Sequence, residues 1–309
     1  TINPDRTGFT GVVRSQFCKQ PLRQSPGFEI LWCGQFTHIG YYALRRCADH
    51  ANLSVSTWRK SGMKSLYWMT HDLRLDDNPA LLQAAQSEEL LLVYVVDPAW
   101  FRVNRFGQLS MGNHRWLFVQ QALIDLDSAL RDLGHRLCIV EGDPGETIAQ
   151  ILHQIPFQRL VTSQQFGSDE LDRIERLKRV HPQVRFEIVD TYTLFDRQSL
   201  PMPVAEIPET YSRFRRKAEK VPIIAPIPPP TTLPTMVQLK VDRFPLRAEL
   251  EFEVCESQFH GGEAAAQRHV KHYFGEDLPL DYKQVRNALD GWENSSKMSA
   301  WLNAGCLST

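Results

Sequence analysis

One apolar run decides the fold of this 309-residue chain: Leu90-Leu91-Leu92-Val93-Tyr94-Val95-Val96. An uninterrupted run of this kind is typical of a strand covered on both faces, as in the middle of a parallel sheet. Residues 64–69 form a second strand pattern upstream of it. Between the two strands, Asn78 and Pro79 predict a helix through Ala85, because asparagine suits the N-cap and proline suits the first helical position.

The alternation of strands and helices continues to residue 189. A long amphipathic helix is predicted from Gly112 to Leu133, because apolar residues repeat there at spacings of three and four. Three more strands are predicted over 137–140, 160–162 and 185–189, with helices after Pro144 and over 169–180. This alternation predicts an α/β fold, a Rossmann-like doubly wound parallel sheet with helices on both faces. No G-x-G-x-x-G follows the first strand, so the usual dinucleotide cradle is not expected.

The chain changes character on both sides of this region. Residues 1–62 are basic and lack periodicity, and they are predicted to be a non-native or disordered extension. Three origins stay open for them: translated upstream DNA with Met63 as the natural start, an organellar transit segment, or a genuine extension. Residues 63–195 form the predicted α/β domain, and the proline-rich residues 196–258 form a predicted linker.

After Gly261-Gly262 the composition becomes helical, with helices predicted over 263–274, 281–289 and 295–307. Three short helices bury little surface by themselves, so residues 259–309 are interpreted as the truncated start of an all-α domain.

Composition and charge exclude several classes of protein. The formal net charge of −1 excludes a strongly basic nucleic-acid coat, although it allows a local basic groove. Six cysteines are scattered without the spacing of a metal site or a disulfide framework, which favours a reducing compartment. No apolar run is long enough to span a membrane, and no signal-peptide pattern opens the chain. We therefore expect a cytoplasmic protein, or an organellar one if residues 1–62 are a transit segment.

Four stretches contain polar or charged residues next to predicted strands and helices. Some of them follow strands, where ligands bind in α/β folds, and one lies in the predicted linker. Asp72-Leu73-Arg74 follows the first strand, where an acid and an arginine two residues apart are expected to form an ion pair. The others are Gly112–Phe118, Phe166–Glu170 and Ile207–Arg215. Each of them, taken alone, also fits an ordinary ion pair, helix start or surface helix.

The fifth stretch combines hydroxyl groups with a lysine. Ser295-Ser296-Lys297-Met298-Ser299 is predicted to open a helix, and hydroxyls, an ammonium group and free helix N–H groups together make an anion site. The alternative is a simple serine N-cap beside a solvated lysine.

These five stretches, in this order, resemble the DNA photolyase and cryptochrome family, close to its DASH group. The resemblance covers roughly residues 63–308, with Met69 and Thr70 standing where the family normally has a Phe-Arg pair. The family joins an α/β antenna domain to an all-helical FAD domain. The resemblance therefore implies FAD contacts at Tyr282, Ser295, Ser296, Lys297, Met298 and Ser299, and an antenna contact at Glu170. It also implies that the antenna is a folate, methenyltetrahydrofolate.

The function implied by the resemblance is light-driven, FAD-dependent repair of cyclobutane pyrimidine dimers in DNA, a carbon–carbon lyase activity. A blue-light photoreceptor without repair activity is the alternative, and a stand-alone α/β chromophore-binding module is a second one. DNA containing pyrimidine dimers is the expected partner of a monomeric protein. Catalytic residues and metal ligands are not expected within this stretch, which should by itself hold FAD weakly or not at all.

Overall fold

The computed structural model describes residues 60–195, 199–241, 243–246, 258–288 and 290–309, which belong to one compact unit. The expected extension, 1–62, lies outside these ranges except for its last three residues. No helix in the described ranges is long and apolar enough to cross a membrane.

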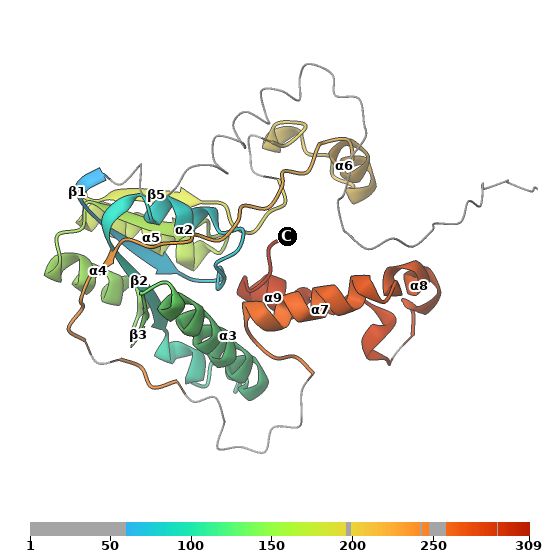
Figure 1. Cartoon of the computed structure of the whole chain (residues 1–309), viewed down its shortest axis with the longest axis horizontal. Coiled ribbons are helices and arrows are strands. Elements are labelled where there is room, and N and C mark those ends of the chain that lie inside the picture. The colour runs from blue at the N-terminus through green and yellow to red at the C-terminus, as the bar shows by residue number, and fades with distance from the viewer. Residues whose placement is uncertain (1–59, 196–198, 242, 247–257, 289) are drawn as a thin grey trace, which may run out of the picture. The chain divides into compact units, whose positions relative to one another are not determined.

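A parallel sheet forms the centre of the fold (Figure 1). Its strands are β1 (Lys60–Met69), β2 (Ser87–Val96), β3 (Leu137–Glu141), β4 (Arg159–Ser163) and β5 (Arg185–Val189). They lie in the order β3-β2-β1-β4-β5, and all of the pairs are parallel. A short strand, β6 (Thr235–Met236), pairs with the start of β2. The predicted doubly wound α/β sheet is therefore confirmed.

Helices cover both faces of the sheet. They are α2 (Pro79–Ala84), α3 (Asn113–Asp132), α4 (Pro144–Gln154) and α5 (Ser168–Val180). Alternate residues of β2 enter two separate cores: Leu90, Leu92 and Tyr94 pack in the core that contains α2 and α3. Leu91 and Val93 pack in the core that contains α4 and α5. Because both faces of β2 are buried, its sequence reads as a continuous apolar run.

Asn78 begins α2 as the sequence predicts. Its side-chain oxygen accepts a hydrogen bond from the backbone N–H of Leu81 at 2.9 Å, which satisfies one of the free donors of the first turn. The amide nitrogen of the same side chain donates to the carbonyl of Arg74 at 2.9 Å. One asparagine therefore fixes both the helix start and the loop that leads into it.

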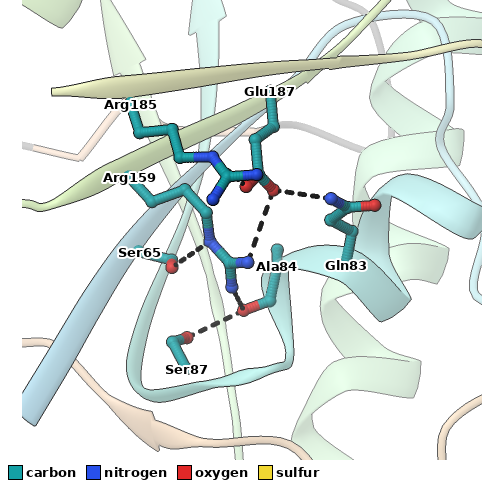
Figure 2. A network of polar contacts seen from close by, with 7 residues as sticks. All are labelled: Ser65, Gln83, Ala84, Ser87, Arg159, Arg185 and Glu187. Carbon is teal, nitrogen blue, oxygen red and sulfur yellow. Dashed lines mark hydrogen bonds and ion pairs between the residues drawn. The ribbon is translucent and has the colours of Figure 1, made fainter. Parts of the chain in front are cut away.

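A buried polar network joins β1, α2, β4 and β5 (Figure 2). Arg159 donates to Ser65 Oγ at 2.9 Å, to the carbonyl of Ala84 at 3.2 Å and to Glu187 Oε2 at 3.3 Å. Gln83 Nε2 donates to the same oxygen of Glu187 at 2.7 Å. Because Arg159 reaches the last turn of α2, the network holds that helix against the sheet.

Six helices of the described ranges follow β5, and β6 lies between the second and the third of them. The six are a 3₁₀ helix (Val204–Glu206), α6 (Tyr211–Ala218), α7 (Glu263–Gly275), α8 (Leu278–Val285), another 3₁₀ helix (Trp292–Asn294) and α9 (Ser299–Ala304). The predicted helix over 281–289 begins earlier and ends earlier than expected. The predicted helix over 295–307 is wrong at both ends, because Lys297 and Gly305 have left-handed backbone conformations, with φ of 51° and 71°.

Two of the six cysteines lie in the described ranges, Cys138 and Cys306, and both are buried free thiols. Burial raises the pKa of both, that of Cys306 to about 12. These thiols are protonated at neutral pH and behave as apolar side chains.

Candidate functional site: a cavity at the carboxyl ends of the strands

The described chain contains a cavity of about 720 Å³ where β1, β2 and β4 end. Trp68 and Met69 of β1, Tyr94 of β2 and Thr162 of β4 line its floor. The chain runs outward from β1 to β3 on one side and crosses to β4 and β5 on the other. In open α/β sheets, ligands bind at this kind of switch point, outside the carboxyl ends of the strands.

Aromatic rings make up much of the wall. Trp68, Tyr94, Trp100, Phe118 and Phe259 all face the cavity. They come from β1, β2, the 3₁₀ helix Pro98–Phe101, α3 and the segment before α7. Flat apolar walls of this kind suit a planar aromatic ligand, and the volume lies in the usual range of small-molecule sites.

Charged groups stand at the start of two helices that open onto the cavity. Arg115 lies in the first turn of α3, and Glu170 lies in the first turn of α5, with Arg173 one turn further. The carboxylate of Glu170 lies over Gly167, the N-cap of α5. Two of the sequence motifs, Gly112–Phe118 and Phe166–Glu170, thus meet at one cavity, and Glu170 lines it.

Asp72 and Arg74 do not form the expected ion pair. The carboxylate of Asp72 is fully buried and accepts hydrogen bonds from the hydroxyls of Tyr67 and Ser163 and from the N–H of Thr70. Burial, and then the nearby charge of Asp72, raises the pKa of Tyr67 well above its ordinary value. Asp72 is therefore satisfied by neutral donors under the floor of the cavity.

The side chain of Arg74 donates its hydrogen bonds to backbone carbonyl oxygens. Its Nε donates to Asp76 at 3.1 Å, its Nη1 to Gly305 at 3.1 Å, and its Nη2 to Asp77 at 2.9 Å and to Thr191 at 3.2 Å. The planar guanidinium presents five donors, so one side chain can join the loops after β1 and β5 to the end of α9. This requirement explains why an arginine stands here without a carboxylate partner.

The Gly261-Gly262-Glu263 stretch packs the segment that carries α7, α8 and α9, here called the helical segment, against the parallel sheet and its helices, here called the sheet domain. Glu263 accepts hydrogen bonds from the N–H groups of Leu75 at 2.8 Å and Asp76 at 2.9 Å. A Cβ at Gly261 would overlap the backbone carbonyl of Phe118 in α3. The glycine is therefore needed for the close approach of two backbones.

The predicted FAD contacts lie in the helical segment. Tyr282 is on α8 with 45% of its surface exposed, and α8 packs against the 3₁₀ helix just before Ser295. Residues 295–298 are half-buried and lie outside any helix, and the exposed Ser299 is the first residue of α9. The carbonyl of Ser296 lies 2.7 Å from His269 Nε2. Ser295, Ser296 and Lys297 therefore precede a helix of six residues that begins at Ser299, and they do not stand on the longer helix that the sequence predicts.

Several lining residues were not among the predicted ligand contacts. Trp100 lies a few residues after strand β2, and Gln165 lies a few residues after strand β4. Arg173 lies one turn beyond Glu170. Their position after parallel strands is the signal that sequence reasoning offers for them.

Residues 65–233 match the DNA photolyase family. The chain belongs to this family. The match contains the whole central sheet apart from the first residues of β1 and the final strand, and it also contains the charged positions Arg115, Glu170 and Arg173 around the cavity.

The names of its curated relatives place this photolyase-family chain near the DASH group. It is 34% identical over 244 residues to the cryptochrome DASH of Idiomarina loihiensis, covering 79% of this chain and 54% of the relative. A crystal structure of a Synechocystis cryptochrome matches with a TM-score of 0.73 and 28% identity, covering 81% and 54% of the two chains. A class III photolyase from Agrobacterium tumefaciens shares the fold, with a TM-score of 0.65 and 20% identity over 81% and 52%.

The chain spans about half the length of the curated relatives it matches. Members of its family are FAD-binding flavoproteins.

Proposed function

We propose that the whole protein is a light-driven, FAD-dependent lyase that splits cyclobutane pyrimidine dimers in DNA. The aromatic cavity carries the proposal, because a planar-ligand site at the sheet's switch point in a photolyase-family chain suits a second, light-collecting chromophore. A solved archaeal photolyase with the same fold is described with two FAD molecules, with the implication of a novel light-harvesting cofactor.

For the cavity we propose a folate chromophore, methenyltetrahydrofolate, held chiefly by Glu170. A pterin ring carries N–H donors along one edge, and a carboxylate is an acceptor for such donors. Trp68 and Trp100 would cover the ring faces, and Arg173 would offer a cation to the negatively charged tail of the folate. The acid as acceptor, the cation as donor and the aromatic walls as stacking surfaces together suit a folate.

For FAD we propose that Tyr282 and residues 295–299 supply part of the site. The hydroxyls of Ser295, Ser296 and Ser299 and the ammonium of Lys297 would bind the pyrophosphate. FAD, when bound and reduced, would supply the photoexcited electron that splits the dimer. The residues of this chain hold and orient the cofactor.

The chromophore proposal is tested by titrating the chain with methenyltetrahydrofolate and following chromophore fluorescence. Glu170→Gln keeps the size of the side chain and removes its charge, so binding should weaken about ten-fold. Glu175→Gln is the matched control, because Glu175 lies on the exposed side of the same helix, in an ion pair with Lys178 at 2.7 Å. Equal affinity of both variants would rule out the assigned role of Glu170.

The repair proposal needs a separate test on the whole protein loaded with FAD. An oligonucleotide that contains one cyclobutane dimer should lose it under blue light and keep it in the dark. A protein that undergoes photoreduction of its flavin but leaves the dimer intact would instead be a photoreceptor. The cryptochrome names of its relatives favour this second candidate.

A further inference from the structure

Helix α6 concentrates positive charge on an exposed surface to which the proposed function gives no role. Residues 207–220 contain five cations and two acids: Arg213, Arg215, Arg216, Lys217 and Lys220, with Glu209 and Glu219. All seven of these side chains are exposed. No other described helix or strand packs extensively on α6. The charge is local, because the chain as a whole has a formal net charge of −1.

Three of the cations lie on one face of α6, and a fourth, Lys220, comes two residues after the end of the helix. Arg213, Arg216, Lys217 and Lys220 follow the spacing i, i+3, i+4, i+7, which places side chains on a single helix face. We name these four residues the basic stripe. Phe214 and Ala218, which are half-buried and buried, face another direction.

The basic stripe extends two residues beyond the end of α6. Lys220 lies in the turn that ends α6, where its N–H donates to the carbonyl of Lys217 at 3.3 Å. At about 1.5 Å per residue, the stripe is about 10 Å long.

The acids of the segment do not neutralise the stripe. Glu219 pairs with Arg215, which lies outside the stripe, at 3.0 Å. Arg213, Lys217 and Lys220 form no ion pair with any residue of the described ranges. Their charges therefore face solvent and remain available to a partner.

Helix stability does not account for this arrangement. Cations in the last turn of a helix are favoured by its dipole, which explains Arg216 and Lys217. Arg213, however, lies in the first turn, where the dipole disfavours a cation. Like charges three and four residues apart also repel one another. The basic stripe thus costs some helix stability, which a polyanionic partner would offset.

We propose that the basic stripe of α6 binds the phosphate backbone of DNA. The proposal rests on DNA as the partner in the proposed function, and it adds a contact surface on the segment between the sheet domain and the FAD segment. Exposed lysines and arginines recognise phosphates without reading sequence, and each contact releases counterions. The stripe is long enough to follow about three phosphates along one strand.

The test is the salt dependence of binding between the chain and a fluorescein-labelled, undamaged DNA duplex, followed by fluorescence anisotropy. The triple variant Arg213→Gln, Lys217→Gln, Lys220→Gln should reduce the slope of log K against log[salt] by about 2 to 3. Its affinity should fall at least about ten-fold at about 100 mM salt, equally for unrelated sequences. Arg213→Lys should keep the wild-type slope, because it preserves the charge.

The matched control removes three cations from α5, with Arg176→Gln, Lys178→Gln and Arg179→Gln. That helix mixes cations with acids such as Glu175, so the slope should change by less than about 1. An equal change in both triple variants would overturn the proposal, as would the absence of DNA binding by the wild-type chain. Tighter binding to phosphatidylserine vesicles than to DNA would overturn it too.

Failure of the proposed repair function would look different. If the α6 variant of the whole protein loses salt-dependent affinity for DNA, but the protein never splits dimers, the proposed DNA contact stands and the proposed lyase activity fails. If the protein repairs dimers equally well with and without the basic stripe, at DNA concentrations below saturation, the proposed DNA contact fails and the proposed lyase activity stands.

Discussion

The Nη1 of Arg74 lies 3.1 Å from the carbonyl oxygen of Gly305, a residue 231 positions later in the chain. This hydrogen bond joins the loop after the first strand to the end of the last described helix. In the same place, the N–H of Leu73 donates to the carbonyl of Ala304 at 3.3 Å. The motif after β1 therefore holds the helical segment against the sheet, and its Leu73 also lines the cavity.

Arg74→Lys should destabilise the chain by about 3 kcal/mol. A lysine keeps the charge but cannot reach four carbonyls in different directions, so buried acceptors lose their donor. Urea denaturation of both proteins measures the difference. Arg131→Lys is the control, because Arg131 is exposed and pairs on the surface with Asp127, and it should change stability by less than about 1 kcal/mol.

Gly305→Ala should be more destabilising than Gly134→Ala. Both glycines follow a helix with φ near the left-handed region, at 71° and 70°. A Cβ at Gly305 would overlap the backbone carbonyl of His71, whereas a Cβ at Gly134 has nothing within 4 Å. Gly134→Ala should therefore cost only about 1 kcal/mol. Equal unfolding midpoints for the two variants would show that the close approach at Gly305 is unimportant.

Arg159→Met should cost about 3 kcal/mol, because it leaves Glu187 buried without its closest buried cation (Figure 2). The double variant Arg159→Met, Glu187→Leu should recover part of this loss, since no uncompensated charge remains. Chemical denaturation of the single and double variants measures the free energy of coupling between Arg159 and Glu187. Arg185→Gln removes the exposed partner of the same carboxylate and should cost less than about 1 kcal/mol.

His135 should make the chain less stable in mild acid. Burial lowers the pKa of His135 below its ordinary value of 6.5. Its Nδ1 accepts from the N–H of Arg136 at 2.9 Å, and its Nε2 lies 3.2 Å from the carbonyl of Leu90, an arrangement that suits the neutral ring. As pH falls through 6.5, the unfolded chain binds the proton first, so the free energy of unfolding decreases.

The measurement is the free energy of unfolding between pH 8 and pH 5. His135→Gln should flatten the curve by at most about 1.4 kcal/mol per pH unit. His260→Gln, at an exposed side chain, is the control and should leave the slope unchanged. An unchanged slope in the His135 variant would assign the acid sensitivity to other groups, such as His71 and His181, whose pKa burial also lowers.

The fold could be predicted because its signals are local. The apolar run 90–96 is buried on both faces, and Asn78 caps its helix through a side chain three residues from its partner. The predicted helix over 295–307 is wrong at both ends because the backbone is left-handed at Lys297 and at Gly305. The spacing of side chains does not report that change in backbone conformation.

The candidate site could be predicted only in pieces. Sequence reasoning selected the starts of two helices, near Arg115 and Glu170, but had no means of placing them at one cavity. The expected pair between Asp72 and Arg74 is wrong for a related reason. Asp72 finds donors on β1 and β4, and Arg74 finds acceptors at Thr191 and Gly305, all set by distant chain segments.

The sequence by itself determined the parallel sheet and its helices, because burial on one or two faces imposes a period on nearby residues. Its ordered motifs also carried the resemblance to the photolyase family. Only the tertiary structure decided which motifs line the cavity and which join the sheet to the helical segment. Those roles depend on backbones that approach closely across long loops, as at Gly261 and Gly305, and contacts between distant segments leave no period in the sequence.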